Sequence, residues 1–139
     1  MKPLLYLILS FAAFTWGVTS PNEGVTVTVT LENVLNDQGE ILAALHTSAS
    51  FMKGPGLANF KTEAKKGTLT FTFENVDPGT YAISVLHDLN SNQRMDFQPG
   101  GMPKEPYAMS GNEMSMGPPS FESAAFQVGE DPVHLRIRF

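Results

Sequence analysis

Residues 25–31 read Val-Thr-Val-Thr-Val-Thr-Leu, a strict alternation of apolar side chains with threonine. Successive side chains of a β-strand point to opposite faces, so this period of two predicts a strand with one buried and one solvated face. The same alternation returns in Leu-Thr-Phe-Thr-Phe at residues 69–73. These two stretches favour a domain that is built from β-sheets.

Turn clusters divide the rest of the chain into further short apolar stretches. The other predicted strands are residues 41–46, 80–86, 124–128 and 133–139, and turn clusters at residues 36–39, 77–79 and 129–132 precede three of them. We interpret residues 41–46 as the hairpin partner of residues 25–31, because the turn cluster 36–39 lies between them. Residues 62–66 leave two alternatives open, one turn of helix or a short edge strand. The pattern predicts an all-β fold, a two-sheet β-sandwich of about seven strands.

The composition is that of one folded domain, with 139 residues, 42% apolar residues, 12 Gly and 10 Pro. Acidic residues outnumber basic ones by 14 to 9, which gives a formal charge of −5. A nucleic-acid partner is excluded, since phosphate binding needs a basic face. The chain contains no Cys, which excludes disulfides, thiolate metal sites and a lipid-modified cysteine.

The first 20 residues have the three regions of a secretory signal peptide. Lys2 supplies a positive charge, an apolar run extends from Leu4 to Trp16, and small residues follow. This run is shorter than the ~20 residues that a membrane-spanning helix needs. We expect residues 1–20 to be cleaved and residues 21–139 to form a single β-sandwich domain, secreted or periplasmic, without stable membrane insertion. The alternative is an uncleaved N-terminal anchor.

One loop, from about residue 87 to residue 119, breaks the regular spacing of strands and turns. Loops of this length are uncommon in compact domains and are usually functional. Its first part carries oxygen-bearing side chains at alternate positions, a spacing with which a loop can wrap a hard cation. The predicted metal ligands, with calcium as the expected ion, are Asp88, Asn90, Asn92 and Asp96, together with the backbone carbonyl of Arg94.

The loop departs from the EF-hand pattern at two positions. Gln93 stands at the sixth position, where that pattern has Gly, and Pro99 stands at the twelfth, where it has a bidentate Glu. Glu105 lies further on and could reach back to the loop. Two carboxylates predict weak calcium affinity, with a Kd of about 10⁻⁴ to 10⁻³ M. The alternative is a metal-free run of turns in which Asn and Asp side chains hydrogen-bond their own backbone.

Two motifs in this half of the chain are specific: His-Asp-Leu-Asn-Ser-Asn at residues 87–92 and Gly-Pro-Pro-Ser-Phe at residues 117–121. With Gly-Thr-Tyr-Ala at residues 79–82 and Gly-Met-Pro-Lys-Glu-Pro-Tyr at residues 101–107, they resemble the secreted bacterial family catalogued as domain of unknown function 2141. The resemblance implies an exported β-sandwich, prealbumin-like or immunoglobulin-like, without an established activity. The sequence departs from this family at Gln93, where Gly is usual, and at Met109.

Methionine is concentrated in the same loop, which suggests a second function. Thioethers are soft ligands for Cu(I), so a periplasmic copper carrier is one alternative, with His87 or His46 as a further ligand. The other interpretation is that Met fills gaps where the loop packs over a sheet edge. The residues concerned, five of the seven Met, stand at positions 95, 102, 109, 114 and 116.

A third function is a small carbohydrate-binding protein, with Tyr107, Phe97 and Phe121 as stacking residues. Catalysis is poorly supported: His87 and Asp88 are neighbours on a strand end, so their side chains diverge. Ser120 lacks the glycine frame of a nucleophile elbow. We therefore expect a non-enzymatic exported β-sandwich whose long loop is ordered by a cation.

Overall fold

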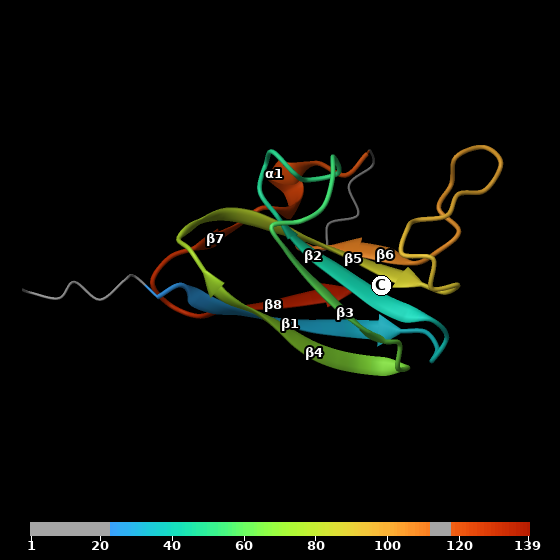
Figure 1. Ribbon diagram of the computed structural model, residues 1–139, viewed down its shortest axis with the longest axis horizontal. Coiled ribbons are helices and arrows are strands. Elements are labelled where there is room, and N and C mark those ends of the chain that lie inside the picture. The colour runs from blue at the N-terminus through green and yellow to red at the C-terminus, as the bar shows by residue number, and fades with distance from the viewer. Residues whose placement is uncertain (1–22, 112–117) are drawn as a thin grey trace, which may run out of the picture.

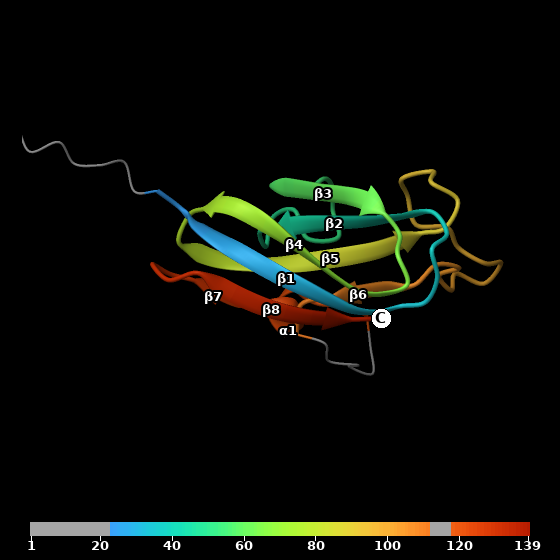
Figure 2. The same cartoon turned by 90° about the horizontal axis from the view of Figure 1, so that it is seen from below.

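The computed structural model describes residues 23–111 and 118–139, which form two β-sheets packed face to face (Figure 1). The elements are β1 (Val25–Val34), β2 (Glu40–His46), β3 (Ala58–Glu63), β4 (Gly67–Val76), β5 (Gly79–Asp88), β6 (Tyr107–Met109), α1 (Phe121–Ala124), β7 (Phe126–Val128) and β8 (Val133–Arg138). One sheet has the order β4-β1-β8; the other has the order β3-β2-β5-β6, with β7 also paired to β5. Figure 2 shows the strands of one sheet crossing those of the other at an angle. The predicted two-sheet β-sandwich is confirmed.

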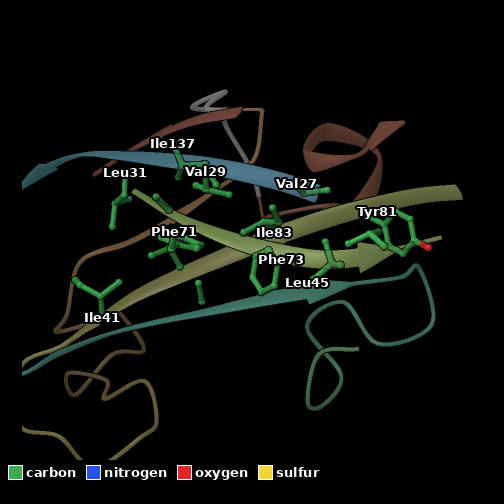
Figure 3. Close-up of a cluster of buried hydrophobic side chains, with 14 of the residues drawn as sticks. Val27, Val29, Leu31, Ile41, Leu45, Phe71, Phe73, Tyr81, Ile83 and Ile137 are labelled. Carbon is green, nitrogen blue, oxygen red and sulfur yellow. The ribbon is translucent and has the colours of Figure 1, made fainter. Parts of the chain in front are cut away.

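The alternating stretches behave as predicted. Val27, Val29 and Leu31 are fully buried on the inner face of β1, while the threonines between them lie on the outer face. β4 pairs antiparallel with β1, and β8 pairs parallel with it on the other side. Figure 3 shows side chains from both sheets meeting in the space between them. Burial of this apolar surface is the main force that holds the sheets together.

The predicted hairpin between residues 25–31 and residues 41–46 is wrong. β1 pairs with β4 and β8, whereas β2 pairs with β3 and β5 in the other sheet. Each of the two strands has one apolar face, and placing them in opposite sheets buries both faces against each other. A period of two describes the faces of a strand and does not identify its hydrogen-bonded partner.

In three further segments the observed strands differ from the predicted ones. Of residues 62–66, expected to form a helical turn or a short edge strand, only Thr62 and Glu63 lie in a strand, at the end of the edge strand β3. The long loop contains the short strand β6, which its irregular sequence did not indicate. Ala124, predicted in a strand, instead ends helix α1, because the Ser120 side chain caps that helix by accepting a hydrogen bond from the Ser123 N–H.

The expected leader, residues 1–20, lies outside the described residues. Within residues 23–111 and 118–139, no helix has the length and hydropathy needed to cross a bilayer.

Candidate functional site

The first candidate site is the loop that follows the central strand β5 (Figure 1). Asp88 ends that strand and is fully buried. Its Oδ1 accepts a hydrogen bond from the Asn92 N–H at 3.2 Å, and its Oδ2 accepts one from the Gln93 N–H at 2.6 Å. A carboxylate that accepts backbone N–H groups four and five residues later bends the chain into a tight loop. Gly39 faces this corner, where a Cβ would overlap the Asp88 carbonyl oxygen.

Two asparagines continue the pattern and bring Asp96 back to it. Asn90 Oδ1 accepts from the Asn92 N–H at 3.3 Å, and Asn92 Oδ1 accepts from the Arg94 N–H at 3.1 Å. The side-chain amides of Asn90 and Asn92 both donate to the Asp96 carboxylate, at 2.6 and 2.9 Å for its Oδ2. These donors hold the pKa of Asp96 below its usual value, since they favour the charged form. Four predicted ligands therefore share one small loop, while the Arg94 side chain is exposed.

Glu105 does reach back, as its position in the sequence allowed. Its side chain is nearly buried. Oε1 accepts from the Leu89 N–H at 3.0 Å, and Oε2 accepts from the Asp96 N–H at 3.2 Å. Glu105 therefore joins the start and the end of the Asp/Asn loop, which we define as residues 88–96.

The sharp turn at Gln93 is made with a left-handed backbone, φ 62°, at the position where the EF-hand pattern has Gly. Ser91 also has a positive φ, 56°. A side chain in this region of φ is strained by about 1 kcal/mol or more. At Gln93 the backbone N–H donates to Asp88 Oδ2, which favours this conformation of the turn.

The donor atoms of the Asp/Asn loop determine which metal ions it could bind. Its side chains supply hard oxygen atoms, the type that calcium prefers. The oxygens of Asp88 and Glu105 already accept backbone N–H groups, each through one lone pair. In the described part of the chain, no group of three or more His, Asp or Glu side chains is placed to hold a metal ion.

The second candidate site is a groove on the outer face of the five-stranded sheet. Strand register places two rows of side chains side by side on this face. One row is Lys61, Leu42, Leu86 and Tyr107, and the next is Asn59, Ala44, Ser84 and Met109. Because Ala44 and Ser84 are small and occupy the two middle strands, the centre of the sheet is hollow.

Loops form the walls of this groove, which contains a cavity of about 630 Å³. Gln93, Met95, Phe97 and Pro103 come from the connection between β5 and β6, and Met52 comes from the connection between β2 and β3. Several walls expose large apolar side chains to solvent: Met52 is 64%, Phe97 57% and Tyr107 44% exposed. A concave, mainly apolar surface of this size is typical of a small-molecule site.

The residues considered for copper are divided between different places. Met95 and Met109 line the groove, Met102 is 70% exposed, and Met114 and Met116 lie outside the described residues. His46 shares hydrogen bonds with Ser50 Oγ and Ser84 Oγ, at 3.3 and 3.1 Å. The ring of His87 is buried, 2.6 Å from the Gln38 carbonyl oxygen through Nε2.

The aromatic residues and the candidate catalytic groups also separate. Tyr107 and Phe97 line the groove, whereas Phe121 packs edge-on against Phe51 at 5.9 Å between ring centroids. His87 and Asp88 hydrogen-bond different partners, and Ser120 caps helix α1. The groove, with its Met-rich and aromatic walls, had no signal in the sequence beyond the concentration of Met and aromatic residues in the long loop.

The two sheets pack face to face, and most of their strand pairs are antiparallel. This arrangement defines the protein as a β-sandwich. The chain belongs to the family described as "Uncharacterized protein conserved in bacteria (DUF2141)", which matches residues 29–136. The matched region contains the Asp/Asn loop and all the groove residues named above, and the resemblance to this family found in the sequence is confirmed. Comparisons with curated proteins and with solved structures found no match.

Proposed function

We propose that the protein is an exported, non-enzymatic binding protein whose ligand occupies the groove on the five-stranded sheet. The observation that carries this proposal is the cavity of about 630 Å³ with solvent-exposed Met and aromatic walls. Exposed apolar side chains are costly when they cluster, and clusters on a monomeric surface mark binding sites. Methionine suits such a surface because its flexible thioether adapts to the shape of a ligand.

Binding of a neutral apolar probe tests this function. We expect N-phenyl-1-naphthylamine to bind the protein with an increase in fluorescence and a one-to-one stoichiometry. Leu42→Gln places an amide on the floor of the groove. The bound probe would remove water from this amide, and the free-energy cost should weaken binding about tenfold. Leu35→Gln is the matched control, because Leu35 is also exposed, at 53%, and does not line the groove.

Equal probe affinity of the two variants would contradict the proposal, provided that both retain the melting temperature of the wild type. Absence of any saturable probe binding by the wild type would contradict it as well. Export of the protein, the other part of the proposal, is supported by the leader-like residues 1–20 and has a separate test in the Discussion.

A second candidate function is calcium binding by the Asp/Asn loop. It is supported by the convergence of Asp88, Asn90, Asn92 and Asp96 and by the left-handed turn at Gln93. Calcium would stabilise the loop that forms one wall of the groove. Elemental analysis of the purified, mature protein distinguishes the metals: after dialysis against 10 mM calcium, about ten times the expected Kd, we expect an excess of calcium over the dialysate near one equivalent, and copper at background.

A further inference from the structure

The groove has an unusual distribution of charge for this protein. Acidic residues outnumber basic ones in the chain, 14 to 9. Among the described residues that line the groove, however, Lys61 is the only charged one, and none is acidic. The groove therefore presents a mainly apolar surface, with the polar side chains of Asn59, Ser84 and Gln93 and a single positive charge, on a negatively charged protein.

The position of Lys61 makes the two ends of the groove chemically different. It lies on the edge strand β3, at one end of the row that continues through Leu42 and Leu86 to Tyr107 on β6. Neighbouring strands are about 4.8 Å apart, so the three spacings from β3 to β6 make the row roughly 15 Å long. One end of the groove is cationic, and the rest of this row is apolar or aromatic.

Lys61 remains accessible to an anion. Its Nζ lies 3.5 Å from Glu40 Oε1, and its side chain is 51% exposed. An ammonium group has three donors, and an exposed ion pair of this kind contributes little stability. An incoming anion can therefore share the Lys61 ammonium or displace Glu40 from it at small cost.

We propose that the groove binds a single elongated amphiphile, with its anionic headgroup at Lys61 and its apolar chain over Leu42 and Leu86 toward Tyr107. This proposal depends on the proposed function and specifies its ligand class. Charge complementarity favours an anion over a cation, because none of the described lining residues is acidic and the neighbouring Glu40 carboxylate is already paired with Lys61. The cavity volume is that of a small-molecule site, which favours one free molecule over a membrane surface.

Displacement of N-phenyl-1-naphthylamine by three ligands of equal chain length tests the headgroup. The ligands are decanoate and decyltrimethylammonium, each below its critical micelle concentration, and decanol, below its aqueous solubility limit. We expect decanoate to displace the probe about tenfold more tightly than decanol, as one charge-assisted contact at a partly exposed site allows. Decyltrimethylammonium should bind more weakly than decanol.

Two variants of the ion pair give opposite expectations. Lys61→Met keeps the apolar stem and should reduce decanoate affinity to that of decanol, while decanol affinity is unchanged. Glu40→Gln removes the competing carboxylate and should tighten decanoate binding without affecting decanol. Lys65→Met is the matched control, because Lys65 is an exposed lysine that does not line the groove.

The outcomes separate this inference from the proposed function. If decanol equals decanoate in the wild type, or if Lys61→Met leaves their ratio unchanged, the anionic ligand is wrong while the groove remains a binding site. If the neutral probe does not bind at all, the proposed function itself fails. Binding only to phosphatidylglycerol vesicles, or formation of a dimer that occludes the probe, would also overturn the assignment of a single free amphiphile.

Discussion

Ser110 connects three segments through one buried hydroxyl. Its Oγ donates to the Ala124 carbonyl at 2.6 Å and accepts from the Ile83 N–H at 2.9 Å. It lies just beyond β6 and ties this short strand to β5 and to the end of helix α1. The hydroxyl is therefore a structural joint between the long loop and the sheet.

Ser110→Ala should reduce the free energy of unfolding by about 2 kcal/mol, because it leaves two buried backbone groups without a partner. Urea unfolding monitored by circular dichroism measures this change. Ser48→Ala, at an exposed position, is the control and should change the free energy by less than about 0.5 kcal/mol. A Ser110→Ala variant as stable as this control would mean that water replaces the hydroxyl.

His46 makes stability depend on pH. The ring is 5% exposed and packs edge-on against Phe51 at 5.8 Å. Burial lowers its pKa below 6.5, while its contact with Ser50 opposes this shift. The unfolded state therefore binds a proton more readily than the folded state, so the contribution of His46 to stability is complete above pH 6.5 and is lost as the pH falls from 6.5 to the lower folded pKa.

We expect the free energy of unfolding of the wild type to decrease between pH 7 and pH 5, and His46→Gln to reduce this decrease. Urea unfolding at several pH values provides the measurement. His134→Gln, on an exposed position of β8, is the control and should retain the wild-type slope. Identical slopes for His46→Gln and the wild type would assign the pH dependence to other groups.

The Asp/Asn loop is held in shape by hydrogen bonds to its carboxylate and amide side chains. The Asp88 carboxylate supports the loop backbone, since both of its oxygens accept backbone N–H groups. Its replacement by Ala would destabilise the loop with or without calcium. Asp96 is the better position for a test, because its carboxylate accepts side-chain donors of Asn90 and Asn92.

Calcium at 10 mM should stabilise the wild type by about 1.4 kcal/mol if the Kd is about 1 mM. For a domain of this size the melting temperature rises by roughly 4–8 °C. Magnesium should have a smaller effect, since it dehydrates reluctantly. Asp96→Asn should abolish the calcium response, and Asp131→Asn, on an exposed turn, should preserve it. Equal shifts for the wild type and Asp96→Asn between EDTA and calcium would identify the loop as a metal-free turn network.

The sandwich has two outer faces with different chemistry. The outer face of the three-stranded sheet carries polar side chains, such as Thr28 opposite Thr72 and Thr30 opposite Thr70. The outer face of the five-stranded sheet is apolar at its centre and partly enclosed by loops. This second face carries the groove, and the Asp/Asn loop at its rim joins the two candidate functions in one region.

The proposed export predicts that the mature chain begins between Val18 and Asn22. The intact mass of protein recovered from the secreted or periplasmic fraction is the measurement. A signal peptide is removed on export, and the chain has no Cys that could carry a lipid anchor. A full-length mass in the membrane fraction would show that residues 1–20 are retained as an anchor.

Local sequence was sufficient for the strands with an alternating pattern and for the Asp/Asn loop. Residues 25–31 and 69–73 alternate because each strand must present one apolar face to the core, and the apolar residues of both stretches are buried or half-buried in the structure. The contacts among Asp88, Asn90 and Asn92 span at most a few residues of chain, so their spacing alone predicts that they converge. The family motifs lie in the same part of the chain.

Tertiary structure decided strand partnership and the groove. β1 and β2 are separated by one short turn, yet they lie in different sheets, because the core is closed by burying their apolar faces against each other. β6 is too short to have a recognisable period, and it forms by pairing with β5. The groove joins Leu42, Leu86 and Tyr107 from strands distant in sequence, and its single charge comes from Lys61 on a further strand. Such a surface exists only after the strands are in register. A local pattern of residues therefore cannot predict it.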